Sequence, residues 1–368
     1  MVPHAVRIRR FQLLLTLLAC VSVAWTAAAA AAAGSITIDM RTPTLDRWMY
    51  PFNGSPGTRP NASTFTALGS EEFEDVFDNR DAQFLVGFDT GALVEPGLGP
   101  ARYQIHSARL IATISDGGIF PYDPTYDTFT TYLPAEDPDF TPDDTPGRPI
   151  ELYGVGFRNG FTAATFLENS PFGQQFGQGL RNAFATDVKD GVPRDVSNNV
   201  RDRFDPTPFA IGQTLNAAPG QIVPTDAVFN FDLDLNNPDV VAYLQAAMND
   251  GRLRLLITSL HPAEGGPGGG EGGQFPIFYT KENKFAPFDD VEPALELVVE
   301  ILPESPQNPQ GDINGDGVVN SQDLAILLGS WGVCPPEPDD CPADVNGDGV
   351  VNSQDLAIVL GNWGATAN

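Results

Sequence analysis

Residues 311–332 read GDINGDGVVNSQDLAILLGSWG, and residues 344–364 repeat this segment as DVNGDGVVNSQDLAIVLGNWG. Each copy contains the pattern D-x-N-x-D-G, which is typical of loops that bind calcium. Counting from the first aspartate of each copy, side-chain oxygens fall at positions one, three, five, nine and twelve. These predicted ligands are Asp312, Asn314, Asp316, Asn320 and Asp323 in the first copy, and Asp344, Asn346, Asp348, Asn352 and Asp355 in the second.

The spacing suits calcium because that ion takes roughly 6–8 oxygen ligands, which a loop of about a dozen residues can place around it. The sixth position is Gly317 or Gly349, where the chain must turn sharply. The seventh position, Val318 or Val350, is predicted to contribute its backbone carbonyl. We therefore predict two Ca2+ ions, one for each copy. The alternative is a pair of metal-free turns, but two complete matches in a short tail favour the calcium interpretation.

Each loop leads directly into a predicted helix. Asn320 and Asn352 suit the N-cap position, and an aspartate three residues later completes a pattern that resembles a capping box. The helix is short and ends at Gly329 in the first copy. One such helix cannot bury its own apolar face, so we expect the two copies to pack against each other. Trp331 and Trp363, which follow the helices, are expected to pack between the copies.

At these residues the C-terminal segment resembles a type I dockerin, the calcium-loop module that attaches secreted enzymes to cohesin domains. The resemblance implies calcium-dependent folding and a helix face that binds a cohesin-like domain or a cell-surface scaffold. The two copies are nearly identical, and in this they resemble the family, whose binding face has two-fold symmetry. The family often carries basic residues later in the helix, where this chain has leucine and glycine. The family's recognition pair maps onto Ser321 and Gln322 in the first copy, and onto Ser353 and Gln354 in the second.

Residues 1–33 have the organisation of a secretory signal peptide. Three arginines supply the positive start, an apolar stretch follows as far as Trp25, and an alanine run offers cleavage sites. The apolar stretch is short for a membrane-spanning helix, so we predict a secreted or cell-surface protein. Cys20 lies in a segment that resembles a lipoprotein cleavage box, but apolar residues continue beyond it. An ordinary signal is therefore favoured over a lipoprotein signal.

Two cysteines remain beyond the signal, Cys334 and Cys341, and both lie between the predicted calcium loops. An exported chain can keep a disulfide. The prolines between the two cysteines bend the connecting segment, so a disulfide that closes it is our prediction. With no histidine nearby, a zinc site has little support.

The chain of 368 residues carries a formal net charge of −28, and only three of its residues are lysines. Such a charge repels nucleic acid and anionic membranes, which argues against both as partners. After residue 33 no apolar run is long enough to cross a bilayer, so we predict no membrane span. The composition suits an exported protein that holds cations.

Between the signal and the tail, several short segments alternate apolar and polar residues, which is typical of strands with one buried face. The clearest alternation places Phe229 and Phe231 on one face of residues 228–235. One convincing helix follows, with Asn237 as its cap and Gly251 at its end. Other predicted strands span residues 35–39, 82–89, 103–115, 150–157, 252–260, 275–279 and 294–301.

This order of elements predicts a mainly β protein: an antiparallel, jelly-roll-like β-sandwich followed by a small α-helical dockerin-like domain. The domains are predicted as a signal peptide at residues 1–33, the sandwich at 34–302, a linker at 303–310 and the dockerin-like domain at 311–368. The sandwich resembles secreted jelly-roll modules of the DNRLRE and carbohydrate-binding kind, through an aspartate-opened first strand and the stretches FLVGFD and ARLIATI. That resemblance identifies no residue of a binding site.

A long loop-like stretch at residues 116–149 carries many acidic side chains among prolines and aromatic residues. Loops of this length in a compact domain are usually functional or disordered. Its aspartates could hold a structural calcium ion, although a solvated surface insertion is the favoured interpretation. They include Asp123, Asp127, Asp137, Asp139, Asp143 and Asp144.

Signals for catalysis are weak in the predicted sandwich at residues 34–302, which we call the body. Neither H-E-x-x-H nor G-x-S-x-G occurs, and His106 and His261 are interpreted as packed or surface residues. Trp48 lies near Tyr50 and Phe52, a group that could stack on a sugar ring. A buried position for Trp48 is nevertheless favoured, because large aromatic side chains are mostly buried.

We therefore interpret the chain as an exported calcium-binding protein whose tail mediates docking and whose sandwich binds carbohydrate or another surface ligand. A second hypothesis is a secreted glycoside hydrolase that acts in polysaccharide catabolism, because that chemistry needs only two carboxylates. An enzyme is the less favoured of the two. A third hypothesis is a structural envelope protein. Released sugar would identify the enzyme, and a tail that binds calcium but no protein would indicate the structural role.

Overall fold

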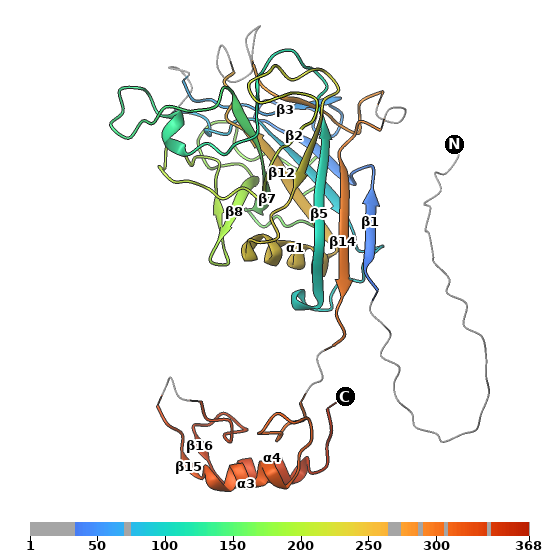
Figure 1. The fold of residues 1–368 in the computed structure, drawn as a ribbon, viewed down its shortest axis with the longest axis vertical. Coiled ribbons are helices and arrows are strands. Elements are labelled where there is room, and N and C mark those ends of the chain that lie inside the picture. Colours follow the sequence, from blue (N-terminus) through green and yellow to red (C-terminus); the bar gives the residue numbers. More distant parts are fainter. Residues whose placement is uncertain are drawn as a thin grey trace, which may run out of the picture. The chain divides into compact units, whose positions relative to one another are not determined.

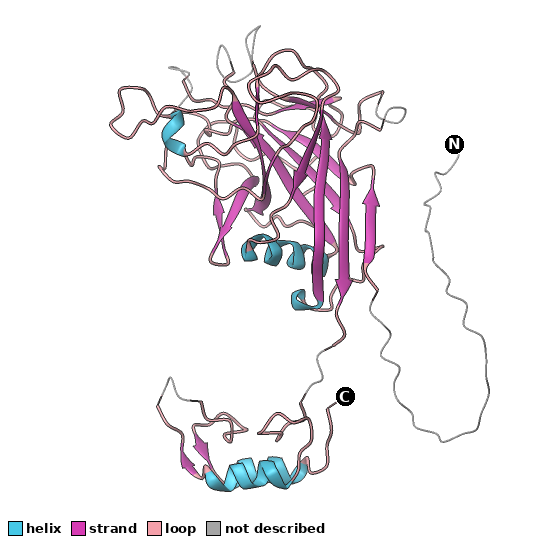
Figure 2. Cartoon of the chain, viewed as in Figure 1, coloured by secondary structure: helices cyan, strands magenta, loops and turns pink. Residues whose placement is uncertain are grey.

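The predicted signal peptide lies outside the residues described by the computed structural model, which are 34–69, 75–263, 274–285, 290–304, 308–336 and 340–367. Strands dominate the residues before 302, and helices are few (Figure 1, Figure 2). This confirms the prediction of a mainly β protein with antiparallel sheets. None of the helices in the described part of the chain is long and apolar enough to cross a bilayer.

The smaller sheet of the body has four antiparallel strands, in the order β1 (Ile36–Met40), β14 (Ala294–Ile301), β5 (Tyr103–Thr113) and β11 (Val228–Asp232). The strands β14 and β5 make the longest pairing of this sheet, and it contains one register shift between Val298 and Val299. The first and last strands of the body are therefore neighbours.

The larger sheet has the order β2 (Leu45–Met49), β4 (Gln83–Asp89), β12 (Arg252–Ser259), β7 (Arg148–Phe157), β8 (Ala183–Lys189) and β9 (Val192–Asp195). Two short strands also pair with β7: β6 (Tyr122–Asp123), which runs parallel to it, and β10 (Ala210–Ile211), which runs antiparallel. A separate antiparallel pair is formed by β3 (Asn61–Ser63) and β13 (Ile277–Tyr279).

The main core of the body lies between these two sheets. Leu110 of the smaller sheet and Leu255 of the larger sheet belong to one cluster and are fully buried. The predicted alternation of residues 228–235 is confirmed, since Phe229 and Phe231 lie in this cluster. Burial of each such side chain contributes roughly 1.5–3 kcal/mol. The two facing sheets form a β-sandwich, while the narrower jelly-roll resemblance stays a prediction.

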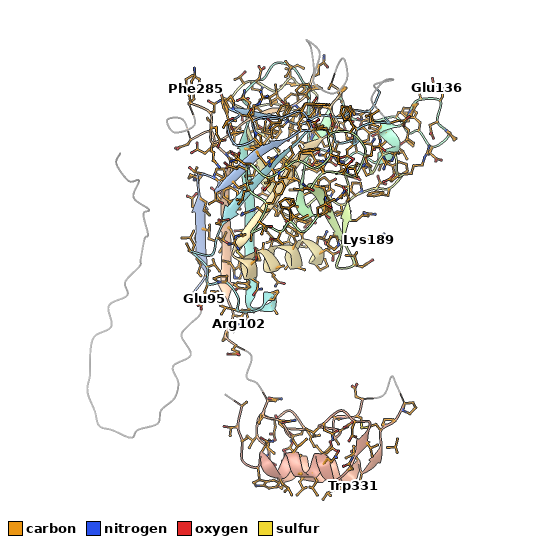
Figure 3. The ribbon with its side chains drawn as sticks, turned by 180° about the vertical axis from the view of Figure 1, so that it is seen from behind. Glu95, Arg102, Glu136, Lys189, Phe285 and Trp331 are labelled. Carbon is orange, nitrogen blue, oxygen red and sulfur yellow. A yellow bond between two sulfur atoms is a disulfide. The ribbon has the colours of Figure 1, made fainter. Side chains whose placement is uncertain are left out.

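The helix α1 (Pro238–Asp250) lies across one end of the sandwich (Figure 1). Asn237 caps it by accepting a hydrogen bond from the Asp239 N–H at 3.0 Å, and Gly251 ends it at φ 74°, a conformation that favours glycine. The predicted cap and end are both confirmed. The short helix η1 (Pro100–Arg102) contacts α1 at the same end (Figure 3). The buried residues of α1 are Val240, Leu244, Ala247 and Met248.

The larger sheet is covered on both of its faces. On the outer face a second buried cluster contains Leu85, Tyr153 and Leu256, and residues 158–182 cover it with Phe166 and other aromatic side chains. Because both faces are covered, β4 is buried from Gln83 to Phe88 and β12 from Leu253 to Ser259, with no exposed face along these residues. The segment between β7 and β8, whose structure the sequence does not indicate, therefore serves as the cover of the sheet.

Buried charged residues accompany this outer cluster. Arg80 pairs with Glu151, and Arg181 Nε donates to Asp78 Oδ2 at 2.7 Å. All four side chains are at most 4% exposed, so each charge depends on its partner. Asp81 is different, because neither of its buried carboxylate oxygens has a hydrogen-bond partner among the described residues.

The two neighbouring aspartates titrate in opposite directions. Burial raises the pKa of Asp81 to about 7. Burial also acts to raise the pKa of Asp78, but the Arg181 charge and hydrogen bonds from Gly179 and Asn198 lower this pKa overall. Ionisation of Asp81 therefore opposes folding, whereas ionisation of Asp78 favours it.

We predict that Asp81→Asn increases the free energy of unfolding at pH 8 and changes it little at pH 4. In the unfolded chain this carboxyl ionises near its ordinary pKa of 3.8, whereas the folded protein keeps it protonated up to about pH 7. Ionisation therefore stabilises the unfolded state across that interval and lowers the free energy of unfolding. The variant cannot ionise at this position, so it avoids this decrease. The gain at pH 8 is at most about 4 kcal/mol, because each pKa unit corresponds to about 1.36 kcal/mol.

Urea unfolding at the two pH values measures this effect. The matched control is Asp78→Asn, which removes a paired carboxylate and should destabilise the protein most at pH 8. A stabilisation by Asp81→Asn that is equal at pH 4 and pH 8 would contradict the assignment.

Candidate functional site

The described residues of the tail form two loop–helix copies. Their helices are α3 (Ser321–Gly329) and α4 (Ser353–Gly361). In the first copy the Asn320 side chain accepts a hydrogen bond from the Gln322 N–H at 2.8 Å, and Asp323 accepts one from the Asn320 N–H at 2.8 Å. This is the predicted capping box, and the second copy has the same box at Asn352 and Asp355.

The first aspartate organises each loop. Asp312 Oδ1 accepts hydrogen bonds from the N–H groups of Gly315 and Asp316, at 2.9 and 3.2 Å, and Oδ2 accepts one from Gly317 at 2.8 Å. Gly317 has φ 87°, a left-handed conformation that suits the glycine predicted at the sixth position. The side chain at the first position thus holds the turn together from the inside.

The last predicted ligand ties the helix to the start of the loop. Asp323 is fully buried, and its carboxylate accepts hydrogen bonds from the N–H groups of Ile313 at 2.8 Å and Asn314 at 3.1 Å. Burial acts to raise the pKa of Asp323, but the N–H donors of Asn320, Asn314 and Ile313 lower this pKa overall. The carboxylate is therefore held in its charged form at a place where an unpaired charge is costly.

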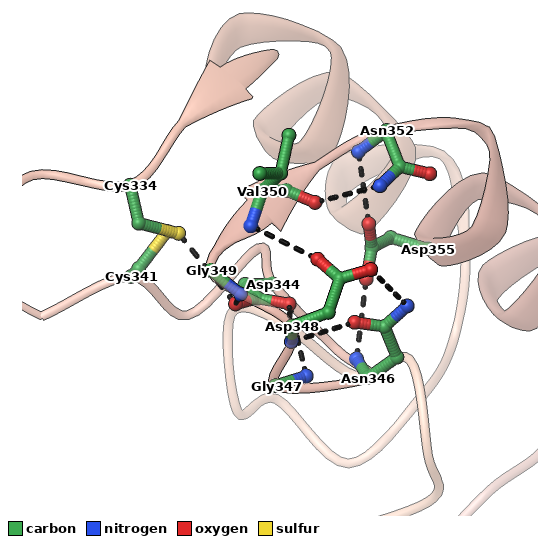
Figure 4. Close-up of a disulfide and its surroundings, with 10 residues drawn as sticks. All are labelled: Cys334, Cys341, Asp344, Asn346, Gly347, Asp348, Gly349, Val350, Asn352 and Asp355. Carbon is green, nitrogen blue, oxygen red and sulfur yellow. Dashed lines mark hydrogen bonds between the residues drawn. A yellow bond between two sulfur atoms is a disulfide. The ribbon is translucent and has the colours of Figure 1, made fainter.

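The second loop repeats these contacts with equivalent residues. Asp344 accepts hydrogen bonds from three N–H groups of its loop at 2.7–3.1 Å, and Asp355 is fully buried. Figure 4 shows that Asp344, Asn346, Asp348 and Asp355 gather around the interior of this loop. The pKa of Asp355 is lowered in the same way as that of its counterpart, by N–H donors that outweigh burial.

The seventh and ninth positions lie side by side in each loop. Asn320 Nδ2 donates to the Val318 carbonyl at 3.0 Å, and Asn352 Nδ2 donates to the Val350 carbonyl at 3.0 Å. The structure thus brings together the residues predicted for each loop. They offer carboxylate, amide and backbone carbonyl oxygens, the donors that hard cations such as calcium prefer. The residues present therefore fit a calcium ion.

The two copies pack against each other, as predicted. A buried cluster contains Val319 and Leu327 from the first copy, and Val351 and Val359 from the second. The strand β15 (Gly332–Val333) pairs with β16 (Val350–Val351). Likewise, the Val319 N–H donates to the Ala365 carbonyl at 3.0 Å. Each loop is therefore closed by the segment that follows the helix of the other copy.

A disulfide joins Cys334 and Cys341, the pair that the sequence predicts, with an S–S distance of 2.08 Å. Both cysteines pack against the buried cluster between the copies. The bridge lies beside the second loop (Figure 4). It therefore connects the segment after α3 to the start of the second loop.

The tryptophans that follow the helices are exposed. Trp331 and Trp363 are 50% and 49% exposed, and Figure 3 shows Trp331 at the surface of the tail. The prediction that they pack between the copies is wrong. Leu327 and Val359 fill that space instead, because they lie about one helical turn after the buried aspartates.

Each helix also presents an exposed face, which contains the predicted recognition serine and a leucine whose exposure the sequence analysis missed. Ser321, Ala325 and Leu328 are spaced by four and three residues, so they lie on one side of α3, and all three are exposed. Leu328 and Leu360 are 54% and 52% exposed. The helical spacing could have indicated this face, but every apolar residue was assigned to the core. The equivalent residues of α4 are Ser353, Ala357 and Leu360.

Residues 310–361 match the family model described as the dockerin type I domain. The C-terminal module is a type I dockerin domain. A comparison of the chain with curated proteins gives no match. The dockerin domain supports a docking role for this chain, and type I dockerin domains bind calcium, in agreement with the oxygen donors of the two loops.

Of the aromatic residues considered for sugar binding in the body, Tyr50 is buried and Trp48 is half-buried, whereas Phe52 is 42% exposed. Trp48 is half-buried, stacks on Tyr50 at a centroid distance of 4.6 Å and donates its indole N–H to the Ser63 carbonyl at 2.9 Å. Trp48 therefore packs against the core, in the direction of the favoured interpretation, but it is half-buried and not fully buried. His261 is buried and His106 is exposed, so both also fit their interpretation as packed or surface residues.

The body has a cleft of about 480 Å³, which is lined by α1, by the strands β7, β8, β9 and β12, and by residues 161–163. Its lining includes three half-buried phenylalanines, Phe157, Phe161 and Phe184, and the charged residues Asp250 and Arg252. Sequence reasoning did not find this cleft, because its lining comes from segments that lie far apart along the chain.

We predict that Asp312→Ala combined with Asp344→Ala unfolds the dockerin domain even in millimolar calcium, and leaves the melting of the body unchanged. Each substitution removes a predicted calcium ligand and deprives three loop N–H groups of their acceptor. Each N–H group that stays buried without an acceptor costs about 1–3 kcal/mol. Circular dichroism measures the loss of helix, and calorimetric titration measures bound calcium.

The control is Ser321→Ala combined with Ser353→Ala, which changes the exposed face and should preserve both folding and calcium binding. A dockerin domain that stays folded and binds two calcium ions after the aspartate substitutions would show that the ligand assignment is wrong.

Proposed function

We propose that this chain is an exported protein whose dockerin domain docks, in the presence of calcium, onto a cohesin-like domain of a partner or cell-surface scaffold. The observation that carries this proposal is the duplicated exposed face of α3 and α4. Leu328 and Leu360 have nearly equal exposure, and so have Trp331 and Trp363. Two equivalent faces on one module offer a partner two equivalent ways to bind.

The chemistry of the face indicates the chemistry of its partner. Residues 311–368 contain no lysine, arginine or histidine, so the dockerin domain offers apolar and acidic groups but no basic side chain. We expect the partner to present an apolar pocket for Leu328 and hydrogen-bonding groups for Ser321 and Gln322. Positive charge around that pocket would accelerate association with the acidic module.

Calcium binding and docking are linked through Gln322. Its Oε1 accepts a hydrogen bond from Asn314 Nδ2 at 2.9 Å, and Gln354 accepts the equivalent bond from Asn346 at 3.1 Å. A cation held by the amide oxygen of Asn314 fixes the orientation of that amide, and with it the donor that holds Gln322. Docking should therefore depend on calcium even if the partner never touches the ion.

We predict that Leu328→Asp combined with Leu360→Asp lowers the affinity for cohesin domains by roughly 30-fold or more, the loss expected for a central apolar contact. Either substitution alone should raise the Kd only about twofold, because one of two equivalent faces remains. Surface plasmon resonance of the full chain over a panel of immobilised cohesin domains, in calcium, measures both effects.

The matched control is Leu215→Asp, which adds the same charge at a fully exposed leucine of the body and should not change docking. If each single substitution weakens binding as much as the pair, the partner needs both faces at once and they are not two alternative ways to bind. If the pair binds normally, docking uses another surface.

We also propose that the body binds carbohydrate in the cleft between α1 and the strands β7, β8 and β9. Phe157 and Phe161 offer aromatic surface for a sugar ring, and Asp250 and Arg252 offer hydrogen bonds for its hydroxyl groups. Asp250 is the only acidic residue among the described residues that line this cleft. A glycosidase needs two carboxylates, so this lining favours binding over hydrolysis.

We predict that the chain is depleted from solution by an insoluble polysaccharide without release of soluble sugar. Phe161→Ala should weaken retention by roughly 2–10-fold, the range expected for one aromatic stacking contact. The control is Phe176→Ala, which removes an exposed phenylalanine outside the cleft. Depletion of the protein and release of soluble sugar are measured in the same samples, in the presence of calcium.

The three hypotheses for the body give different results in this experiment. Depletion without sugar supports a binding module. Released sugar would make the body a glycoside hydrolase. If the chain is not depleted and no sugar is released, the result would favour a structural envelope protein.

A further inference from the structure

Three aspartates from the long loop region of the body converge beside the first residue of β7. Asp123 lies in β6, Asp127 follows it, and Asp143 lies shortly before Arg148. One carboxylate oxygen from each aspartate lies within 4.8 Å of the other two. The interpretation of these acids as a solvated insertion is therefore wrong for Asp123 and Asp127, which are buried.

Asp123 supplies a second observation that is independent of this clustering. The residue is only 2% exposed, and its Oδ1 accepts the Thr125 N–H at 2.8 Å. Its buried Oδ2 has no hydrogen-bond partner among the described residues. Buried polar atoms of folded proteins are almost always paired with protein groups, water or an ion. An unpaired carboxylate oxygen that belongs to an acidic cluster indicates a bound cation or water.

Arg148 offsets only part of the negative charge. Its Nη1 donates to Asp127 Oδ2 and to Asp143 Oδ2, both at 3.0 Å, and its guanidinium lies 4.4 Å from the centroid of the Tyr132 ring. Three carboxylates beside one guanidinium leave two negative charges uncompensated. Each carboxylate has about four lone-pair positions, so these bonds leave room for a further cation.

The pKa values agree with this excess of negative charge. Burial is the largest cause that raises the pKa of Asp127, to about 6, and Asp143 and Asp123 raise it further against the effect of Arg148. Burial is also the largest cause that raises the pKa of Asp123.

A cavity of about 340 Å³ borders the cluster. Asp127 and Asp143 line it, together with the hydroxyl-bearing residues Thr125, Thr131 and Thr145. The site therefore combines carboxylate and hydroxyl oxygens with space for water, and its described lining offers no histidine or cysteine ligand. Such donors select hard cations, and calcium accepts this mixture in irregular geometry more readily than magnesium.

We propose that Asp123, Asp127 and Asp143 form a calcium site of the body that is separate from the two loops of the dockerin domain. Calcium there joins β6, through Asp123, to two points of the loop region between β6 and β7, Asp127 and Asp143. This inference does not rest on the proposed docking function or on carbohydrate binding.

The number of calcium ions bound per chain tests the proposal. The full chain carrying Asp312→Ala and Asp344→Ala, in which the dockerin loops are disabled, should still bind one ion in equilibrium dialysis. Adding Asp123→Asn should remove that ion. Glu136→Gln, an equal change of charge at an exposed residue of the same loop region (Figure 3), should keep it.

A melting experiment separates a cation ligand from a residue that only supports the fold. In the same background, each tenfold rise of free calcium above the Kd should raise the melting temperature of the body by about 2–4 °C. Asp123→Asn should abolish this rise without lowering the melting temperature in EDTA, because it removes an uncompensated charge. Asp143→Asn, at a less buried ligand, should abolish the rise as well.

Either of two results would overturn the proposal. One is a chain with disabled dockerin loops that binds no calcium. The other is an unchanged number of bound ions in both the Asp123→Asn and the Asp143→Asn chains. Neither result would affect the docking proposal, which is measured on the dockerin domain with its loops intact.

Discussion

Carboxylates that converge in a folded chain repel one another, and the two parts of this protein differ in the groups that offset this repulsion. In the body, arginines are buried beside the acids, as in the pairs Arg80 with Glu151 and Arg181 with Asp78. The dockerin domain contains no lysine or arginine, so its aspartates depend on backbone N–H donors and on a cation. Folding of the tail and binding of calcium are therefore expected to be one process.

The same constraint connects the calcium loops to the exposed face of each helix. Each loop places its last carboxylate at the start of a helix, where it caps that helix and is buried. The buried side of α3 needs only Asp323 and Leu327, so Ser321, Ala325 and Leu328 remain at the surface. Because the copies differ little, the second helix presents the same group. The duplication that completes the core therefore also produces two equivalent surfaces.

Sequence reasoning succeeded where the interacting groups lie close together along the chain. The residues of each loop lie within about a dozen positions, and the structure brings them together, while their role as ligands stays a prediction. The caps of α1 and of the dockerin helices are also contacts between near neighbours. The strands with one buried face, such as β11, follow from simple alternation.

It failed where burial depends on distant segments. The strands β4 and β12 were predicted correctly, but the cover of their outer face by residues 158–182 was not. The apolar character of Trp331 suggested burial, but Leu327 occupies the space between the helices and Trp331 is exposed. In the same way, the aromatic cleft collects side chains from α1 and several strands, and no sequence period relates them.

The sequence by itself determined the duplicated calcium loops, their capped helices, the cysteine pair and the mainly β character of the body. These features depend on spacings of a few residues and on the fixed periods of helix and strand. Only the tertiary structure decided which apolar residues of α3 and α4 stay exposed, and that Asp123, Asp127 and Asp143 meet beside Arg148. The physical reason is that burial and charge compensation depend on which distant segments come into contact, and packing of the whole fold determines those contacts.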